Sequence, residues 1–251
     1  MMYAEQPGRL TSGKMVPRFI AAVACALSLV SVGHANDRPP EPAQIVAPAR
    51  VADFGSEQLS PEVRHVASWS VHSGDHGALP FIVVDKVNGQ LFVFDANGRL
   101  RGGAPALVGA ARGDDSVPGI GSRKISSILP HERTTPAGRF VARMGHGPGN
   151  EDVLWVDYEG AVAIHRVATG VAKDRRLQRL ESKVALDRRI TFGCINLPVK
   201  FYESVVAPMF RDTGGIVYVL PELRPAQALF GSYEVRHVPV AAPPAWAPVP
   251  Q

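Results

Sequence analysis

Cysteine is scarce in this sequence, and the familiar metal and phosphate motifs are missing from it. Only two of its 251 residues are cysteine. It has no CxxC pair and no HExxH segment, the spacings that hold zinc in many proteins. It also has no glycine-rich phosphate loop after an expected strand. We therefore expect no metal and no other cofactor, and we exclude nucleotides as partners.

Excess charge is also small. The formal net charge is +4, with 20% charged and 45% apolar residues, which is ordinary for a globular protein. No run of Lys and Arg with interleaved aromatic residues is present, as a nucleic-acid track would require. We therefore do not expect the protein to bind nucleic acid.

Long apolar runs are limited to one near the N-terminus. Residues 19–32 are largely apolar, follow three basic residues and precede Gly33-His34-Ala35. The run is shorter than the ~20 residues of a membrane span and has the length of a signal-peptide core. We predict a signal peptide over residues 1–35 and export to the periplasm or cell envelope, with membrane contact only during export. An uncleaved anchor is the alternative.

Removal of such a peptide leaves a single thiol. Cys25 lies in the apolar run, so only Cys194 stays in the mature chain. Exported proteins usually hold their cysteines in pairs as disulfides. A lone thiol indicates either a reactive group or a buried cysteine that acts as a small apolar residue, and the count alone leaves both open.

The rest of the chain divides into three parts. Residues 36–77 are a Pro-rich leader followed by a short helix, which starts at Ser60-Pro61. Residues 78–222 form one mainly β domain with a few helices. Residues 223–251 are a Pro/Ala-rich tail.

Within residues 78–222, the strongest signal is Asn88-Gly89 between two runs of β-branched and aromatic residues, which predicts a β-hairpin. Residues 113–133 read as a long surface loop, and residues 170–189 as a charged helix or solvated loop. Pro198 opens an amphipathic helix. The expected apolar face of that helix consists of Phe201, Val205 and Met209, and further strands are expected at residues 106–109, 139–142, 153–157, 161–165 and 216–220.

The surroundings of Cys194 favour a reactive thiol. Gly193 gives the backbone freedom just before the cysteine, and Pro198 starts a helix a few residues later. The N–H groups of Gly193 and Cys194 are candidates for holding an oxyanion. A thiol nucleophile also needs an imidazole, and among eight histidines His165 is distinctive because it ends an apolar strand. The alternatives are a tight turn with an inert cysteine and an ordinary rim histidine.

Three segments together resemble the L,D-transpeptidase (YkuD-type) family: Thr135-Pro136-Ala137-Gly138-Arg139-Phe140, the strand ending in His165, and Thr191-Phe192-Gly193-Cys194-Ile195-Asn196. The resemblance covers about residues 79–222. It implies a β-sandwich or barrel-like catalytic domain that acts on peptidoglycan stem peptides through a cysteine thioester. It further implies Cys194 as nucleophile, His165 as base oriented by the carbonyl of Arg166, and a site shaped by Thr191, Phe192 and Asn196.

Two features depart from the family pattern. Phe192 stands where the family has a histidine before Gly-Cys, which puts the substrate geometry and the bond formed in question. The segment between His165 and Cys194 is longer than usual, and its basic residues suggest either a lid that meets stem-peptide carboxylates or a solvated helix face. Two rival functions stay open: an L,D-carboxypeptidase or amidase on the same scaffold, and a non-catalytic wall-binding module. We expect a monomer.

Overall fold

The computed structural model describes residues 50–235. The predicted signal peptide, residues 1–35, lies outside the described residues, as do the start of the leader and the end of the tail. Between residues 50 and 235, no helix combines the length and apolar character needed to cross a membrane.

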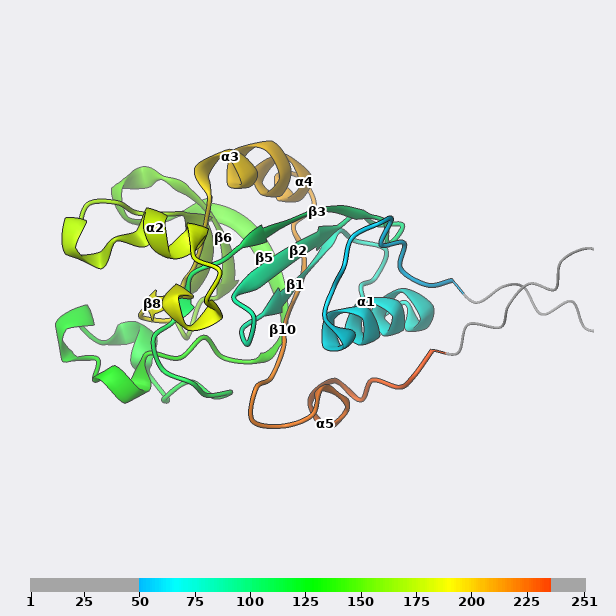
Figure 1. Cartoon of the computed structure of the whole chain (residues 1–251), viewed down its shortest axis with the longest axis horizontal. Coiled ribbons are helices and arrows are strands. Elements are labelled where there is room, and N and C mark those ends of the chain that lie inside the picture. The colour runs from blue at the N-terminus through cyan, green and yellow to red at the C-terminus, as the bar shows by residue number, and fades with distance from the viewer. Residues whose placement is uncertain (1–49, 236–251) are drawn as a thin grey trace, which may run out of the picture. The chain divides into compact units, whose positions relative to one another are not determined.

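The described chain is mainly β with a few helices, as predicted. Eight strands form one curved, nearly closed sheet in the order β3-β2-β1-β10-β5-β6-β7-β9, and β4 pairs with β8 beside it (Figure 1). The β1–β10 and β7–β9 pairs are parallel, and the other neighbours within the large sheet are antiparallel. The strands are β1 Phe81–Asp85, β2 Gln90–Phe94, β3 Leu100–Pro105, β4 Val108–Gly109, β5 Gly138–His146, β6 Asp152–Asp157, β7 Val162–Arg166, β8 Arg189–Thr191, β9 Ile195–Leu197 and β10 Gly215–Val219.

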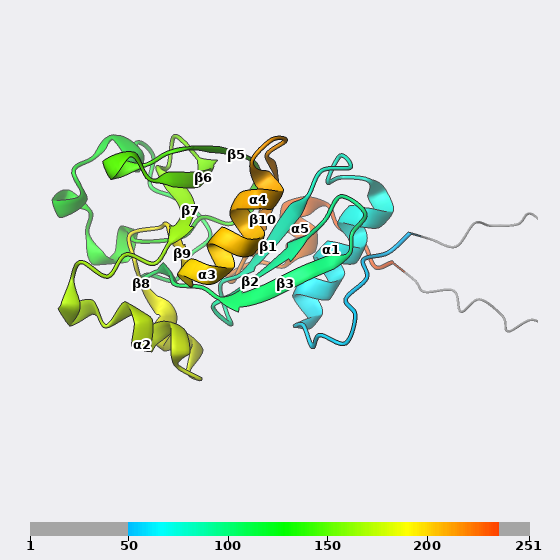
Figure 2. The ribbon, with the colours of Figure 1, turned by 90° about the horizontal axis from the view of Figure 1, so that it is seen from above.

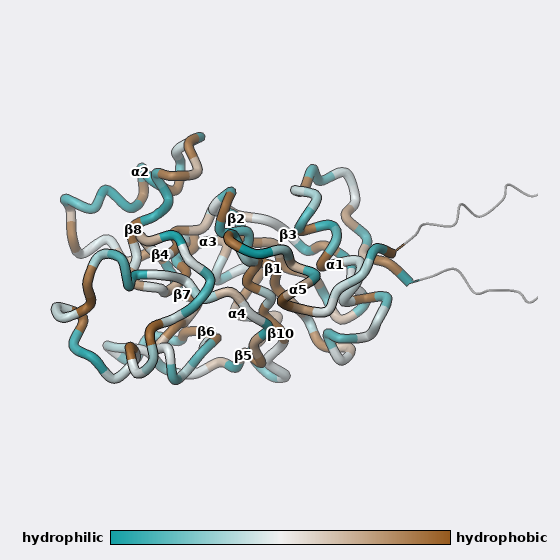
Figure 3. The backbone as a smooth tube through the Cα atoms, turned by 90° about the horizontal axis from the view of Figure 1, so that it is seen from below, coloured by the Kyte–Doolittle hydropathy of each residue, from teal (hydrophilic) through white to brown (hydrophobic). Residues whose placement is uncertain are grey.

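Helices cover both faces of the central strands. Helices α1 (Pro61–Ser73) and α5 (Ala226–Phe230) lie on one face, and the helical segment 199–210 lies on the other (Figure 2). Along β1, Phe81 and Val83 belong to the core with α1, while Ile82 and Val84 belong to the core with segment 199–210. Because both faces are covered, β1 is apolar at successive positions rather than alternating, and the apolar strands run through the centre of the molecule (Figure 3).

The predicted apolar face of the helix after Pro198 packs against the core, but it lies at the edge of the buried face rather than at its centre. It consists of α3 (Val199–Phe201), a π-helical turn (Tyr202–Val206) and α4 (Ala207–Phe210). Tyr202, Val206 and Phe210 are fully buried, whereas the predicted Phe201, Val205 and Met209 are only partly buried. Pro208 has no N–H to donate four residues back, and the π turn, which changes the helical register, lies just before it.

The folded unit extends beyond the predicted boundaries of the β domain. Within the expected tail, Phe230 of α5 stacks on Trp69 at 6.4 Å and meets Tyr218 edge-on at 5.8 Å. Helix α1 begins as predicted, with Ser60 as N-cap and Pro61 at its first position, and its apolar side packs in the same core. Sequence composition indicated a tail because residues 223–251 are rich in Pro and Ala, yet a few aromatic contacts suffice to dock its first part.

A buried lysine ties the long segment between β4 and β5 to the sheet. Lys86 follows β1, its side chain is 1% exposed, and its Nζ donates to Asp114 Oδ1 at 3.1 Å and to the carbonyl of Thr135 at 3.0 Å. Backbone N–H groups of Glu222 and Leu223 also donate to the Asp114 carboxylate. Burial lowers the pKa of Lys86 in spite of its acidic neighbours. The carbonyl of Gly113 accepts the third N–H, so all three donors of this ammonium hold chain segments together.

We predict that Lys86→Met destabilises the protein by about 3–5 kcal/mol, because it leaves the Asp114 carboxylate buried without its cation. Urea denaturation would measure this loss. Lys124→Met is the matched control, since Lys124 is exposed, and it should shift the free energy of unfolding by less than about 0.5 kcal/mol. Equal effects of the two substitutions would contradict the role given to Lys86.

Candidate active site

His165 is held rigidly near the end of β7. Its Nδ1 lies 2.8 Å from the carbonyl of Arg166, the contact predicted from the sequence. A carbonyl can only accept, so Nδ1 carries the proton and Nε2 is the basic nitrogen. Burial, the largest cause, lowers the pKa of His165, and the Arg176 charge acts in the same direction. The imidazole is therefore neutral and able to accept a proton at neutral pH.

Strand pairing brings Cys194 to the same place. Parallel pairing of β7 with β9 sets Ile164 beside Ile195 and His165 beside Asn196. Continued by one residue, this register brings Cys194, just before β9, alongside Ala163 within β7, two residues before His165. The Cys194 thiol donates to the carbonyl of Ala161 at 3.5 Å. Burial raises the pKa of this thiol, while the backbone of Ala163 and the Arg176 charge oppose the rise. The resting state thus combines a protonated thiol, which donates to the carbonyl of Ala161, with a neutral imidazole, which faces Asn196.

The turn before Cys194 is closed by two threonines. Thr191 Oγ1 donates to the carbonyl of Cys194 at 2.6 Å and accepts from the N–H of Gly193 at 3.2 Å. Thr135 Oγ1 donates to the carbonyl of Gly193 at 2.8 Å. Thr191 is buried, so it shapes this turn rather than contacting a ligand. The Gly193 N–H, predicted as an oxyanion donor, is already used within the turn.

Gly193 is required by its backbone conformation. Its φ is +140°, a value that L side chains rarely adopt, and a Cβ atom there would lie 2.9 Å from the carbonyl oxygen of Thr134. The sequence pattern suggested glycine for its freedom before the cysteine, and the close approach of the segment before β5 adds a steric reason.

Asn196 joins the imidazole to the basic segment 170–189. Its amide Nδ2 lies 3.0 Å from Nε2 of His165, and its Oδ1 accepts from Nη1 of Arg176 at 2.8 Å. Asn196 is 1% exposed. It was predicted to bind substrate, but its buried position and its two partners make it a support for the base.

The basic segment packs over this corner as short helical pieces: a 3-10 turn (Ala172–Asp174), α2 (Arg176–Glu181) and a second 3-10 turn (Ala185–Arg188). Leu180 is buried against Leu107 and Val167. The segment is therefore folded onto the domain, and of its basic residues Arg176 reaches Asn196.

A cavity of about 570 Å³ opens beside both candidate catalytic residues, which are part of its lining. Its walls are largely apolar: Trp155 of β6, Phe192, and isoleucines of the loop 113–133. That loop forms three 3-10 turns, Ile120–Ser122, Ile125–Ser127 and Pro130–Glu132. Arg123 and Glu151 add charge to the lining. The cavity can hold a ligand with an apolar part next to the thiol.

Phe192 forms part of the apolar wall, as expected for an aromatic residue at this position. The guanidinium of Arg133 lies over its ring, 4.2 Å from the ring centroid. The side chain of Arg166 points elsewhere: it pairs with Asp152 at 2.7 Å and with Glu203 at 2.9 Å. The part of Arg166 that serves the site is therefore its carbonyl, and its charge is neutralised outside the cavity.

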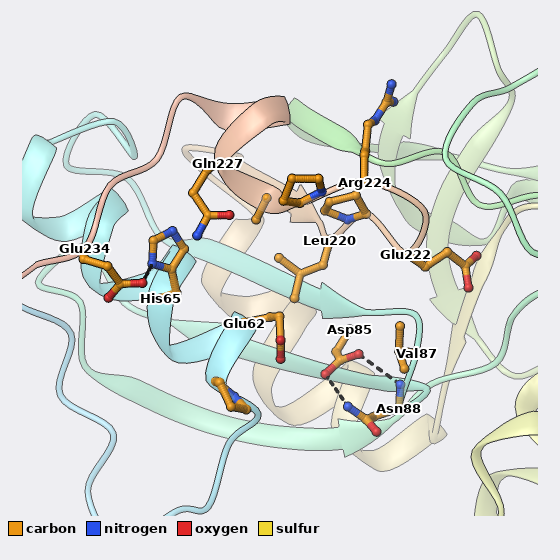
Figure 4. A pocket seen from close by; sticks show the side chains of 14 residues that line it. Glu62, His65, Asp85, Val87, Asn88, Leu220, Glu222, Arg224, Gln227 and Glu234 are labelled. Atoms are coloured by element: carbon orange, nitrogen blue, oxygen red, sulfur yellow. Dashed lines mark hydrogen bonds and ion pairs between the residues drawn. The ribbon is translucent and has the colours of Figure 1, made fainter.

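A second cavity, of about 420 Å³, lies where α1 and the C-terminal segment meet the β1–β2 turn (Figure 4). Most of its charged side chains are already paired. His65 Nδ1 lies 2.9 Å from Glu234, and Asp85 accepts from Asn88 through both carboxylate oxygens. These pairs hold chain segments together, and the nucleophile and base lie in the other cavity.

Sequence reasoning missed the roles of Thr135, Trp155 and the Arg176–Asn196 contact. Thr135 begins the segment Thr135–Phe140 that resembles the family, and this could have identified it as a site residue. The contacts of Trp155 and Arg176 have no local sequence signal. In residues 50–235, no cluster of three or more His, Cys, Asp or Glu residues is arranged to hold a metal ion.

The sequence was compared with known proteins. No protein-family model matches it, and no curated protein matches it.

We predict that Gly193→Ala destabilises the protein by about 1–3 kcal/mol, the cost of strained backbone. Urea denaturation would measure it. Gly170→Ala is the control, because a Cβ atom at Gly170 meets open space. A fully stable Gly193→Ala protein would show that the turn relaxes without strain.

We also predict that alkylation of Cys194 by iodoacetamide has a pH midpoint above the ordinary cysteine value of about 8.5, because burial raises the pKa of the thiol. Peptide mass spectrometry would follow Cys194 separately from Cys25 across the pH range. A midpoint below 8.5 would mean that the thiolate is stabilised in the free protein.

Proposed function

We propose that this protein is an L,D-transpeptidase that acts on peptidoglycan stem peptides in the cell envelope, with a YkuD-like catalytic domain. One observation carries the proposal. Cys194 and His165 come from two neighbouring parallel strands and line one cavity, and the base is oriented by the carbonyl of Arg166. This is the arrangement that cysteine acyl transfer requires.

The reaction begins with proton transfer from the thiol. Cys194 turns from the carbonyl of Ala161 toward Nε2 of His165, and the Asn196 amide yields its place on that nitrogen. Nε2 takes the proton, and the sulfur attacks the carbonyl carbon of the donor peptide. The carbon–nitrogen bond breaks, the leaving amine receives the proton from the imidazolium, and a thioester on Cys194 remains.

The second half reverses these roles. An amine on a neighbouring stem peptide attacks the thioester and loses a proton to His165. The new amide forms, the carbon–sulfur bond breaks, and the imidazolium returns the proton to the sulfur. The N–H of Cys194 is the candidate oxyanion donor, since the N–H of Gly193 is bound to Thr191.

A non-catalytic wall-binding module is the second candidate. The thiol bonds to the carbonyl of Ala161, and burial raises its pKa, as for an inert cysteine. This function predicts that Cys194→Ala leaves binding to isolated peptidoglycan and every cellular phenotype unchanged.

We predict that Cys194→Ser abolishes the acyl-enzyme, seen by intact mass after exposure to stem tetrapeptide. His165→Ala should slow acylation by about 10²–10⁴-fold, the usual loss when a general base is removed. His131→Ala is the control, because His131 is exposed on the loop 113–133, and it should acylate at the wild-type rate.

The products identify the acceptor. Dimeric muropeptides indicate transpeptidation, and trimmed monomers indicate an L,D-carboxypeptidase or amidase on the same Cys–His pair. Two results together would contradict the enzyme and support the wall-binding module. They are that no stem peptide acylates the wild-type protein and that Cys194→Ala leaves the cellular phenotype unchanged.

A further inference from the structure

Arg176 makes three hydrogen bonds at the first turn of α2. Its Nε and Nη2 donate to Asp174 Oδ2 at 3.2 and 3.1 Å, and its Nη1 donates to Asn196 Oδ1 at 2.8 Å. The Arg176 and Asp174 side chains are 16% and 20% exposed. With its donors occupied on both sides, Arg176 is poorly placed to take a substrate carboxylate, the role that a basic lid would require.

The guanidinium decides how the Asn196 amide points. A guanidinium is a donor only, so the atom of Asn196 facing it is the oxygen. The amide nitrogen then faces Nε2 of His165, 3.0 Å away. Because the amide nitrogen donates, Nε2 must accept. The remaining proton of the imidazole is on Nδ1, where the carbonyl of Arg166 accepts it.

The charge of Arg176 acts on both reacting groups. It lowers the pKa of the Cys194 thiol and that of His165, so it favours the thiolate and keeps the base neutral. Glu151 acts on the imidazole in the opposite direction. Asp174 pairs with the same guanidinium, so its negative charge offsets part of the influence of Arg176 on both pKa values.

We infer that Arg176 is a positioning residue for the proposed acyl transfer. By fixing the Asn196 amide, it reinforces the Nδ1–H tautomer of His165 that the carbonyl of Arg166 also favours, and so keeps Nε2 as the proton acceptor. The inference rests on the proposed function. It gives the segment 170–189 a role inside the domain, distinct from that of a substrate-binding lid.

The test uses the full-length chain with Arg176→Gln, Arg176→Lys and the control Lys173→Gln. Lys173 is exposed in the same segment, so its substitution removes one charge without touching Asn196. Circular dichroism would establish that each variant is folded. ¹⁵N-histidine NMR, with His165 assigned from the spectrum of His165→Ala, reports which ring nitrogen carries the proton.

The expected result has three parts. Arg176→Gln populates the Nε2–H tautomer of His165, moves the alkylation midpoint of Cys194 to higher pH, and lowers the acylation rate by up to about 100-fold, as misplacement of a reacting group does. Arg176→Lys keeps the positive charge and a donor, so its tautomer population, alkylation midpoint and acylation rate should lie between those of Arg176→Gln and the wild-type protein. Lys173→Gln matches the wild-type protein.

A second variant, Asn196→Asp, tests the inference even where Arg176→Gln does not fold. Asn196→Asp places acceptor oxygens before Nε2, so Nε2 should carry a proton even with Arg176 present, which gives the imidazolium while Nδ1–H stays bonded to the carbonyl of Arg166. Wild-type tautomer and alkylation profiles in both Arg176→Gln and Asn196→Asp would overturn the inference. Because these readouts need no substrate, they separate this inference from the proposed function: the tautomer can depend on Arg176 even where no stem peptide acylates the protein.

Discussion

The candidate site depends on the parallel pairing of β7 with β9. This short ladder sets His165 beside Asn196, and it thereby carries Cys194, one residue earlier, to the cavity that the imidazole lines. The two residues are separated in sequence by a long charged segment, so no local interaction could bring them together. Because backbone hydrogen bonds fix the strand register to a single residue, the positions of the base and the thiol are set by the sheet rather than by their own side chains.

Buried polar contacts then make this register rigid. Thr191 closes the turn before the thiol, and Thr135 holds the carbonyl of Gly193 from another segment. Lys86 in turn holds the carbonyl of Thr135. These bonds lie where water is excluded, so a missing partner would leave a buried polar group unsatisfied. The loop that carries the nucleophile is thus anchored to the far side of the sheet.

Desolvation has two opposite consequences at this site. It raises the pKa of the thiol and lowers that of the imidazole, so the resting pair is neutral. A neutral imidazole is the correct form of a base, whereas a protonated thiol needs that base before it can attack. In the proposed reaction, the buried surroundings therefore store the nucleophile in an unreactive state until a substrate occupies the cavity.

The sequence by itself determined the mainly β class, the hairpin at Asn88-Gly89, the start of α1, and Cys194 with His165 as the pair to examine, because turn chemistry, strand periodicity and a lone thiol are local signals. It did not determine that Tyr202, Val206 and Phe210 are the most deeply buried residues of the helix after Pro198, or that Phe230 of the expected tail docks on the core. Nor did it reveal the contact of Arg176 with Asn196. These features join residues far apart in the chain, and their partners are chosen only when strands and helices pack, so tertiary structure alone decided them.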